Sequence, residues 1–480
     1  MQAFLTDYWP HLFFVLSTIA GLAAAVHAAM TKDEVRAAIG WAGVAMLSPI
    51  FGAALYLVAG VNRVRRSSVM RKRARTRRGR AADNEDSDSA TLARLPLASL
   101  ARLGDNVSQF PLTFGNRVTP LVGGDAAYPA MIEAIRSAKK SIALASYIFD
   151  HDTAGLAFVE ALAEAQARGV AVRVLIDAVG ARYSKPPLPF LLRQRGIPSA
   201  LFMGNIIMGL KLPYANLRSH RKILVVDGRI GFTGGMNIRE HFLSSAMGEH
   251  TARDTHFRFE GPVVEHLLTV FAEDWHFVTR ELLDGPIWFG RASPVADADV
   301  AARAIPSGPD HTLESNHTMI MGALAAAERR VMICSPYFLP DQQLVGAFGV
   351  AARRGIEVDI VIPDTNNLRL VDYAMTAQLD QVIRRGCRVW RARGVFDHSK
   401  LMTVDGVWSY IGSSNLDPRS LRLNFELDVE VHDPKLASWI EAHISERMAN
   451  AVPETLQSLA ARPLVERLRN RVVWLASPYL

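Results

Sequence analysis

The sequence predicts an α/β fold in which two similar lobes, related by a pseudo-two-fold axis, follow a transmembrane helical hairpin. Three observations lead to this prediction: two long apolar stretches open the chain, a strand–helix–strand pattern occurs twice, and one reactive motif accompanies both copies. A chain of 480 residues has room for two or three domains of roughly 100–200 residues each. We expect the hairpin at residues 1–62, a charged linker at 63–110, and the lobes at 111–300 and 301–480.

The two apolar stretches run from Tyr8 to Met30 and from about Ala37 to Val61. Each has about the 20 residues that a helix needs to cross a hydrocarbon core of about 30 Å. The short polar turn between them predicts a hairpin. A cleaved signal peptide is the alternative, but no Lys or Arg precedes the first stretch, and a second stretch follows at once.

The positive charge of the chain is concentrated in one segment. The net charge is +7, but residues 63–80 contain ten Lys and Arg and no acid, so the remainder sums to 7 − 10 = −3. Such a run after a span predicts a multi-pass protein of the cell inner (plasma) membrane with its catalytic domain on the cytoplasmic side. The run either attracts an anionic membrane surface or acts only as a topology signal. The nearly neutral remainder argues against nucleic acid as a partner.

The strand–helix–strand pattern is the βαβ signature of a parallel-type sheet. In the first copy we expect strands at 141–147 and 170–177 with a helix at 155–168 between them. In the second we expect strands at 330–335 and 356–363, with a helix ending near Gly355. Two copies in one chain predict two similar lobes.

The pattern HxKxxxxD occurs once in each lobe, and a glycine-led turn ending in Asn follows each copy. The residues are His220, Lys222, Asp227 and Asn237 in the first lobe, and His398, Lys400, Asp405 and Asn415 in the second. One such pattern can arise by chance. Two copies with the same downstream turn indicate a shared chemical role, and we take the two motifs as the catalytic set.

These residue types suit displacement at a phosphodiester. Residues i and i+2 of a strand project from one face, so each His and its Lys reach the same space. Imidazole can act as nucleophile, acid or base, a lysine ammonium suits a phosphoryl oxygen, and asparagine adds an uncharged donor for the substrate. One histidine would attack phosphorus while the other protonates the departing oxygen.

Two further acids fall at equivalent positions, Asp254 in the first lobe and Glu426 in the second. An imidazole nucleophile needs an acceptor for its Nδ1 proton, so we hypothesise that these acids orient the histidines. Asp227 and Asp405, although part of the motif, would then be more structural and close the turn where the strand ends.

No metal or cofactor is expected. Neither an HExxH motif nor a CxxC pair occurs, and a lysine two residues from a histidine is a poor neighbour for a cation. Cys334 and Cys387 are too few for a disulfide framework and favour a reduced, cytosol-facing setting.

At this point the sequence resembles the phospholipase D superfamily, and within it the bacterial cardiolipin synthases. The resemblance covers nearly the whole chain, including the paired motifs and the segments 115–116, 146–150, 168–170, 220–238, 271–275, 307–309, 335–341, 412–426 and 477–480. Departures at Ser219, Ala252 and Asp397 flank the motif residues and bear on acceptor preference more than on activity.

The resemblance implies transfer of a phosphatidyl group from one phosphatidylglycerol to another, giving cardiolipin and glycerol through a phosphohistidine intermediate. It implies His220 as the nucleophile and His398 as the acid, although the sequence alone does not break the symmetry. Membrane lipids would be the partners; the oligomeric state stays open. The alternatives are phospholipid hydrolysis by the same residues, a nucleic-acid phosphodiesterase, and a binding protein with an inactive site. The spaced aspartates of metal-dependent phosphatidyltransferases are missing.

Overall fold

A computed structural model describes residues 2–32, 35–60, 95–203, 217–290 and 292–477 of the chain. The basic run and most of the acidic linker that the sequence predicts lie outside these residues. The chain divides into an N-terminal unit of helices and a larger unit that contains all the strands, and each is described by itself.

The N-terminal unit begins with one long helix, α1 (Gln2–Thr31). Its segment Tyr8–Thr31 is, among the described residues, the one helix long and apolar enough to cross a membrane. The second apolar stretch is broken into α2 (Val35–Leu47), α3 (Pro49–Leu55) and the π-helical turn η1 (Tyr56–Gly60).

The break lies at Ser48, which has an extended φ of −138°. Pro49 follows it, and proline both lacks an N–H and disfavours the helical conformation in the residue before it. At 13 and 7 residues, α2 and α3 are each shorter than the about 20 residues that a membrane crossing requires. Of the predicted hairpin, the structure therefore supports one long helix, while the second segment is broken at Ser48.

Small residues and polar contacts hold these helices together. A side chain at Gly21 would collide with the backbone of α2, and one at Gly52 would do the same, so glycine permits the close approach of the helices. His27 Nδ1 of α1 lies 2.7 Å from the hydroxyl of Tyr56, a residue that is 2% exposed.

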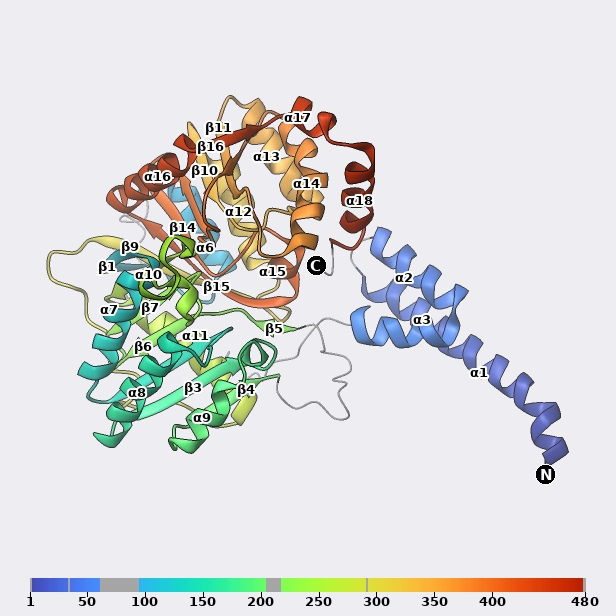
Figure 1. Ribbon diagram of the computed structural model, residues 1–480, viewed down its shortest axis with the longest axis horizontal. Coiled ribbons are helices and arrows are strands. Elements are labelled where there is room, and N and C mark those ends of the chain that lie inside the picture. Colours follow the sequence, from blue (N-terminus) through green and yellow to red (C-terminus); the bar gives the residue numbers. More distant parts are fainter. Residues whose placement is uncertain (1, 33–34, 61–94, 204–216, 291, 478–480) are drawn as a thin grey trace. The chain divides into compact units, whose positions relative to one another are not determined.

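The larger unit is built on one long mixed sheet (Figure 1). The first lobe contributes β1 (Thr113–Val122), β2 (Ser141–Ser146), β3 (Ala171–Asp177), β4 (Ser199–Phe202), β5 (Arg218–Ser219), β6 (Ile223–Val226), β7 (Ile230–Gly234) and β8 (Thr255–Glu260). The second contributes β9 (Val300–Ser307), β10 (Arg330–Cys334), β11 (Glu357–Pro363), β12 (Arg388–Ala392), β13 (Leu401–Val404), β14 (Trp408–Gly412), β15 (Asn424–His432) and β16 (Ala451–Glu454).

The strand order makes the duplication visible. From the centre outward it reads β1-β8-β7-β6-β2-β3-β4 on one side and β9-β15-β14-β13-β10-β11-β12-β16 on the other. β1 and β9 pair antiparallel at the centre and join the lobes. The predicted parallel pairs exist as β2–β3 and β10–β11, but the strands nearer the centre are antiparallel, so the sheet is mixed.

Helices cover both faces of the sheet (Figure 1). In the first lobe they are α7 (Gly123–Ser137), α8 (Thr153–Ala167), α9 (Leu188–Gln194), α10 (Ser244–Met247) and α11 (Val263–Thr279), with short turns η3 (Gly180–Arg182), η4 (Glu240–Phe242) and η5 (Gly248–His250). In the second they are α12 (Ser315–Ala326), α13 (Gln342–Arg353), α14 (Arg369–Ile383), α15 (Pro418–Arg422), α16 (Pro434–Ala449), α17 (Leu456–Ala461) and α18 (Leu464–Trp474). α6 (Ala98–Val107) precedes the first lobe in sequence and packs on the core of the second. Each lobe has its own apolar core between sheet and helices.

Candidate active site

The two motif histidines lie together although they are distant in the sequence. His220 follows β5 and precedes β6, while His398 precedes β13. Their ring centroids are 6.5 Å apart, and each residue is 8% exposed. The spacing leaves room for one phosphorus between two imidazoles, which is the arrangement that attack on one side and protonation on the other require.

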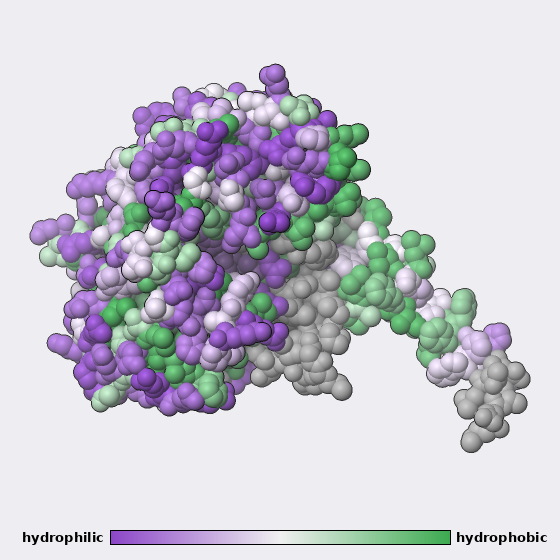
Figure 2. Space-filling model, viewed as in Figure 1, coloured by the Kyte–Doolittle hydropathy of each residue, from purple (hydrophilic) through white to green (hydrophobic). Residues whose placement is uncertain are grey.

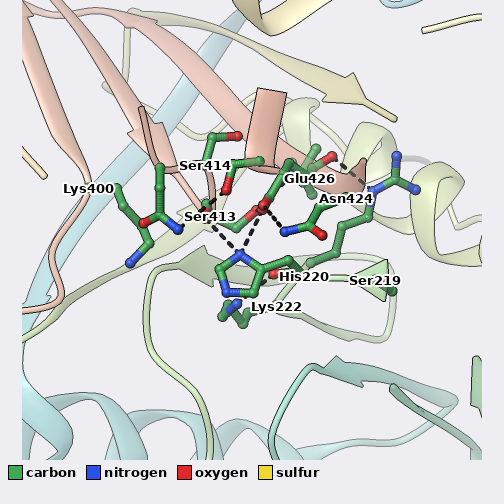
Figure 3. Close-up of polar contacts among 12 residues, drawn as sticks. Ser219, His220, Lys222, Lys400, Ser413, Ser414, Asn424 and Glu426 are labelled. Atoms are coloured by element: carbon green, nitrogen blue, oxygen red, sulfur yellow. Dashed lines mark hydrogen bonds and ion pairs between the residues drawn. The ribbon is translucent and has the colours of Figure 1, made fainter. Parts of the chain in front are cut away.

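Each imidazole is held by an acid from the other lobe. His220 Nδ1 lies 3.0 Å from Glu426 Oε2 of β15, as Figure 3 shows. His398 Nδ1 lies 2.9 Å from Asp254 Oδ2, just before β8. With Nδ1 engaged in this way, Nε2 of each ring is the nitrogen that remains for the substrate. Both acids are fully buried.

Cross-lobe backbone pairing explains this exchange of partners. β5 of the first lobe pairs in parallel with β15 of the second, and His220 N donates to Phe425 O at 2.8 Å. In the matching place, Arg253 forms an isolated parallel bridge with Asp397, and His398 N donates to Arg253 O at 2.7 Å. Each motif therefore enters its site alongside the segment that carries the other lobe's acid.

The two lysines lie beside their histidines and are almost fully buried. Lys222 Nζ donates to His220 O at 2.6 Å, and Lys400 Nζ donates to His398 O at 2.5 Å. Burial lowers the pKa of Lys222 to about 7 and that of Lys400 to about 8, against the opposing charges of Glu426 and Asp254. An anionic substrate would favour the charged form of both.

The two histidine–acid pairs differ electrostatically. Burial lowers the pKa of His220 to about 4 and takes that of His398 well below its ordinary value. The pKa of Glu426 is lowered, because the charges and hydrogen bonds around it, foremost those of His220, outweigh its burial. Burial raises the pKa of Asp254 to about 8. The first pair thus favours an ionised acid, while the second retains a proton.

The two acids also differ in the hydrogen-bond donors around them. Glu426 accepts from Ser413 Oγ at 2.6 Å and from Asn424 Nδ2 at 3.2 Å (Figure 3). Asp254 accepts from the backbone N–H of Thr255 at 2.7 Å. Gly235 occupies the position in the first turn that Ser413 occupies in the second, and a Cβ there would lie 2.5 Å from Asp254 Oδ1. The first turn therefore has no hydroxyl to offer its acid.

The two asparagines occupy the predicted turns. Asn237 Oδ1 accepts from Ile148 N at 3.1 Å, which ties the turn to the end of β2. Asn415 Nδ2 lies 3.3 Å from Ser420 Oγ. Asn415 Oδ1 is buried and, within the described part of the chain, has no hydrogen-bond partner. The second turn adjoins His220, since the Ser413 carbonyl lies 3.1 Å from His220 Nδ1.

Asp227 and Asp405 lie at the opposite ends of β6 and β13 from the histidines. The carboxylate of Asp227 accepts from the N–H groups of residues 139, 140 and 141 at 2.7–3.2 Å. Asp405 accepts from residues 328, 329 and 330, each at 2.8 Å. Both therefore anchor the start of the neighbouring strand, and these contacts are structural.

Several side chains at the site were missed from the sequence. Tyr147 and Tyr337 place their rings edge-on to His220 and His398, with centroids 5.3 and 6.1 Å away. Burial raises the pKa of Tyr147, and the positive charges of Arg419 and Arg218 oppose that rise. Both guanidinium groups therefore contribute positive potential near Tyr147. The Ser-Tyr segment at the end of β2 and the Ser-Pro-Tyr segment after β10 could have signalled the tyrosines.

A residue next to each motif histidine in the sequence forms a buried ion pair. Arg221, next to His220, donates to both carboxylate oxygens of Asp274 on α11 at 2.8 Å. In the second lobe the signs are exchanged, because Asp397, next to His398, pairs with Arg447 of α16. Among the described residues, no three His, Cys, Asp or Glu side chains are grouped so that they could hold a metal ion.

Comparison with known proteins agrees with this geometry. The family model described as "Cardiolipin synthase, PLD-like domain" matches residues 131–275 and 320–448, which contain both motifs. The chain belongs to this family. It is therefore a phosphatidyltransferase-type enzyme of the phospholipase D superfamily.

Cardiolipin synthase relatives match over almost the full chain. Cardiolipin synthase A of Pseudomonas putida (strain GB-1) is 32% identical over 483 residues, covering 99% of this chain and 100% of the relative. Cardiolipin synthase A of Pseudomonas aeruginosa (strain LESB58) is 33% identical, covering 98% and 96%. A phosphatidylserine synthase structure from Haemophilus influenzae Rd KW20 shares the fold, with a TM-score of 0.61 and 16% identity over 80% of this chain and 100% of that one.

Proposed function

We propose that this enzyme transfers a phosphatidyl group from one phosphatidylglycerol to another, giving cardiolipin and glycerol. The observation that carries the proposal is the pair of histidines 6.5 Å apart, each held through Nδ1 by a buried acid. The names of the relatives support the product. The two lysines supply positive charge for the phosphodiester oxygens.

In the first half-reaction, His220 Nε2 attacks phosphorus and forms a P–N bond, while the P–O bond to the terminal glycerol breaks. His398 delivers its Nε2 proton to that departing oxygen. In the second half-reaction, His398 takes a proton from a glycerol hydroxyl of the acceptor lipid. That oxygen then attacks phosphorus, the P–N bond breaks, and cardiolipin leaves.

The difference between the acids supports His220 as the nucleophile. An ionised Glu426 holds the Nδ1 proton of a neutral His220 and leaves a lone pair on Nε2. The raised pKa of Asp254 means that the Asp254–His398 pair holds one more proton at neutral pH, which suits a proton donor. A lowered pKa of Glu426 and a raised pKa of Asp254 give the two histidines the different protonation states that a nucleophile and an acid need.

We further propose that α1 anchors the enzyme in the inner membrane, with its catalytic lobes on the cytoplasmic side. The apolar segment Tyr8–Thr31 supports an anchor. The basic run at residues 63–80 supports the orientation through the positive-inside rule. A multi-pass arrangement would require the α2–α3 segment to cross together, because neither helix crosses alone.

The test is incubation of the purified full chain with phosphatidylglycerol that carries labels in both phosphorus and terminal glycerol. We expect labelled cardiolipin and free glycerol in equal amounts, with neither product from His220→Ala. Phosphatidic acid as the main product would instead establish hydrolysis, because water would then be the acceptor. Alkaline quenching should trap the phosphorus label on the protein, and peptide mapping that finds it elsewhere than at His220 would refute the intermediate.

A further inference from the structure

The last helix, α18, is fixed to the second lobe by one of its faces. Trp474 Nε1 donates to Gln378 Oε1 of α14 at 3.0 Å, and Asn470 is only 3% exposed. Arg471 Nη2 lies 3.1 Å from Asp380 Oδ2 of the same helix. These contacts give α18 a defined orientation on α14, so its remaining face is displayed in a fixed direction.

That remaining face is apolar. Leu464, Val465, Leu468, Val472 and Leu475 are 76, 80, 63, 59 and 73% exposed. At about 100° per residue, these positions fall within an arc of about 100° on the side opposite Asn470. Figure 2 shows hydrophobic surface over α18. Apolar side chains this exposed and this contiguous indicate an interaction surface.

Arginines border the apolar arc. Arg467, Arg469 and Arg471 are exposed, and the segment 462–474 contains four Arg and one Glu, so its charge is 4 − 1 = +3. An apolar stripe of Leu and Val flanked by arginine is the pattern of a helix that lies in the plane of a bilayer surface. The flanking charges fit an anionic partner.

We propose that α18 docks the second lobe onto an anionic lipid surface, with its Leu and Val side chains in the acyl–headgroup boundary. Lipid is favoured over a protein partner because the same chain carries an apolar helix of membrane-spanning length, α1. A body tethered to a membrane meets that membrane at high effective concentration. The inference concerns placement on the membrane and does not rest on the acceptor or on the order of the chemical steps.

The experiment uses the full chain in nanodiscs of phosphatidylcholine with phosphatidylserine, labelled with an environment-sensitive fluorophore at Val472→Cys. The native thiols Cys334 and Cys387 are buried, which keeps labelling specific. The matched control is Val350→Cys on α13, because Val350 and Val472 are 58% and 59% exposed. Quenchers are placed on the acyl chain at shallow and deep positions.

We expect the Val472 label to shift its emission to the blue and to be quenched, more by shallow than by deep quenchers, since an interfacial helix lies about 5–10 Å deep. The Val350 label should show neither effect. Replacing phosphatidylserine with phosphatidylcholine, or raising the salt concentration, should reduce the quenching. Equal, weak quenching of both labels would overturn the proposal. So would a Val472 label that is already buried in detergent and insensitive to lipid, because a protein contact would then cover the face.

Discussion

The two halves of the active site have the same topology but different chemistry. Both place a histidine, a lysine and a cross-lobe acid around one space. In the half around His220, the acid is Glu426, and Ser413 donates to it at 2.6 Å. In the half around His398, the acid is Asp254, and Gly235 stands where the serine would be. The two lobes thus provide equivalent places for a histidine and an acid, and the residues around each acid favour an ionised Glu426 and a protonated Asp254.

The largest expected effect separates the two histidines. Both His220→Ala and His398→Ala should lose at least about 10³-fold in transfer activity with phosphatidylglycerol. With a lipid whose leaving group is p-nitrophenolate, which needs no proton, His398→Ala should still release the chromophore in a burst. His220→Ala should not, since it lacks the nucleophile. A burst in His220→Ala and none in His398→Ala would reverse the assignment.

The next comparison is between the two acids. Glu426→Gln should lower kcat by about 10²-fold or more, because the amide can hold His220 in the wrong tautomer. Asp254→Asn should slow both steps in which His398 gives or takes a proton, so with the p-nitrophenyl substrate it should keep a first-turnover burst, while its steady-state rate stays low. Burst kinetics and steady-state rates on both substrates test this, with thermal unfolding as a control for the fold. Equal losses on both substrates in both variants would contradict the division of roles.

The lysines predict a decline of activity at alkaline pH. Below a pKa of about 7 for Lys222 and about 8 for Lys400 the ammonium forms dominate, and they lose their charge as pH rises. In the free enzyme, kcat/KM should therefore fall by up to about tenfold per pH unit for each lysine that has lost its charge. The fall in kcat should come at higher pH, since a bound phosphodiester favours the charged form. A kcat/KM profile that stays flat to pH 9 would contradict this.

A smaller effect is expected from Ser413→Ala. Removal of one hydrogen bond to an ionised carboxylate costs about 1.5–3 kcal/mol, so activity near neutral pH should fall by about 10- to 10²-fold. Loss of the donor should also raise the pKa of Glu426 and shift the acidic limb of the rate profile to higher pH. Ser414→Ala in the same turn is the control, because Ser414 donates to Asp428 instead. An unchanged acidic limb in Ser413→Ala would argue against the role of this hydroxyl.

The smallest effect on catalysis is expected at the ends of the strands. Asp227→Asn should lower the free energy of unfolding by about 1–3 kcal/mol, since three backbone N–H groups lose a charged acceptor. The kcat of the remaining folded enzyme should hardly change. Thermal unfolding and specific activity of the folded fraction measure the two quantities. A large fall in kcat without a loss of stability would show that Asp227 acts in the reaction.

Much of the site could be anticipated because the sequence repeats itself. The motif residues, the downstream turns and the equivalence of Asp254 and Glu426 all follow from aligning one half with the other. The crossing of partners could not be anticipated, because the β5–β15 pairing that causes it joins residues about 200 positions apart and leaves no local pattern. Gly235 and Ser413 stand at one turn position, but only the contact with each acid shows that they matter.

In the second apolar stretch, by contrast, the sequence contained a local signal that the prediction did not use. Apolar composition predicted a second span, while α2 ends at Leu47 and a new helix begins at Pro49, a residue that is visible in the sequence. Hydropathy averaged over a window does not register one residue that removes a backbone donor. The break could therefore have been predicted from local backbone chemistry.

The exchange of acids between the lobes also affects how the enzyme is made. His220 is synthesised 206 residues before Glu426, so a growing or truncated polypeptide has the imidazole without its partner. The reactive group gains its orientation only when the carboxyl-terminal lobe has folded against the amino-terminal one. A chain that ends before residue 426 therefore lacks the carboxylate that holds His220 Nδ1.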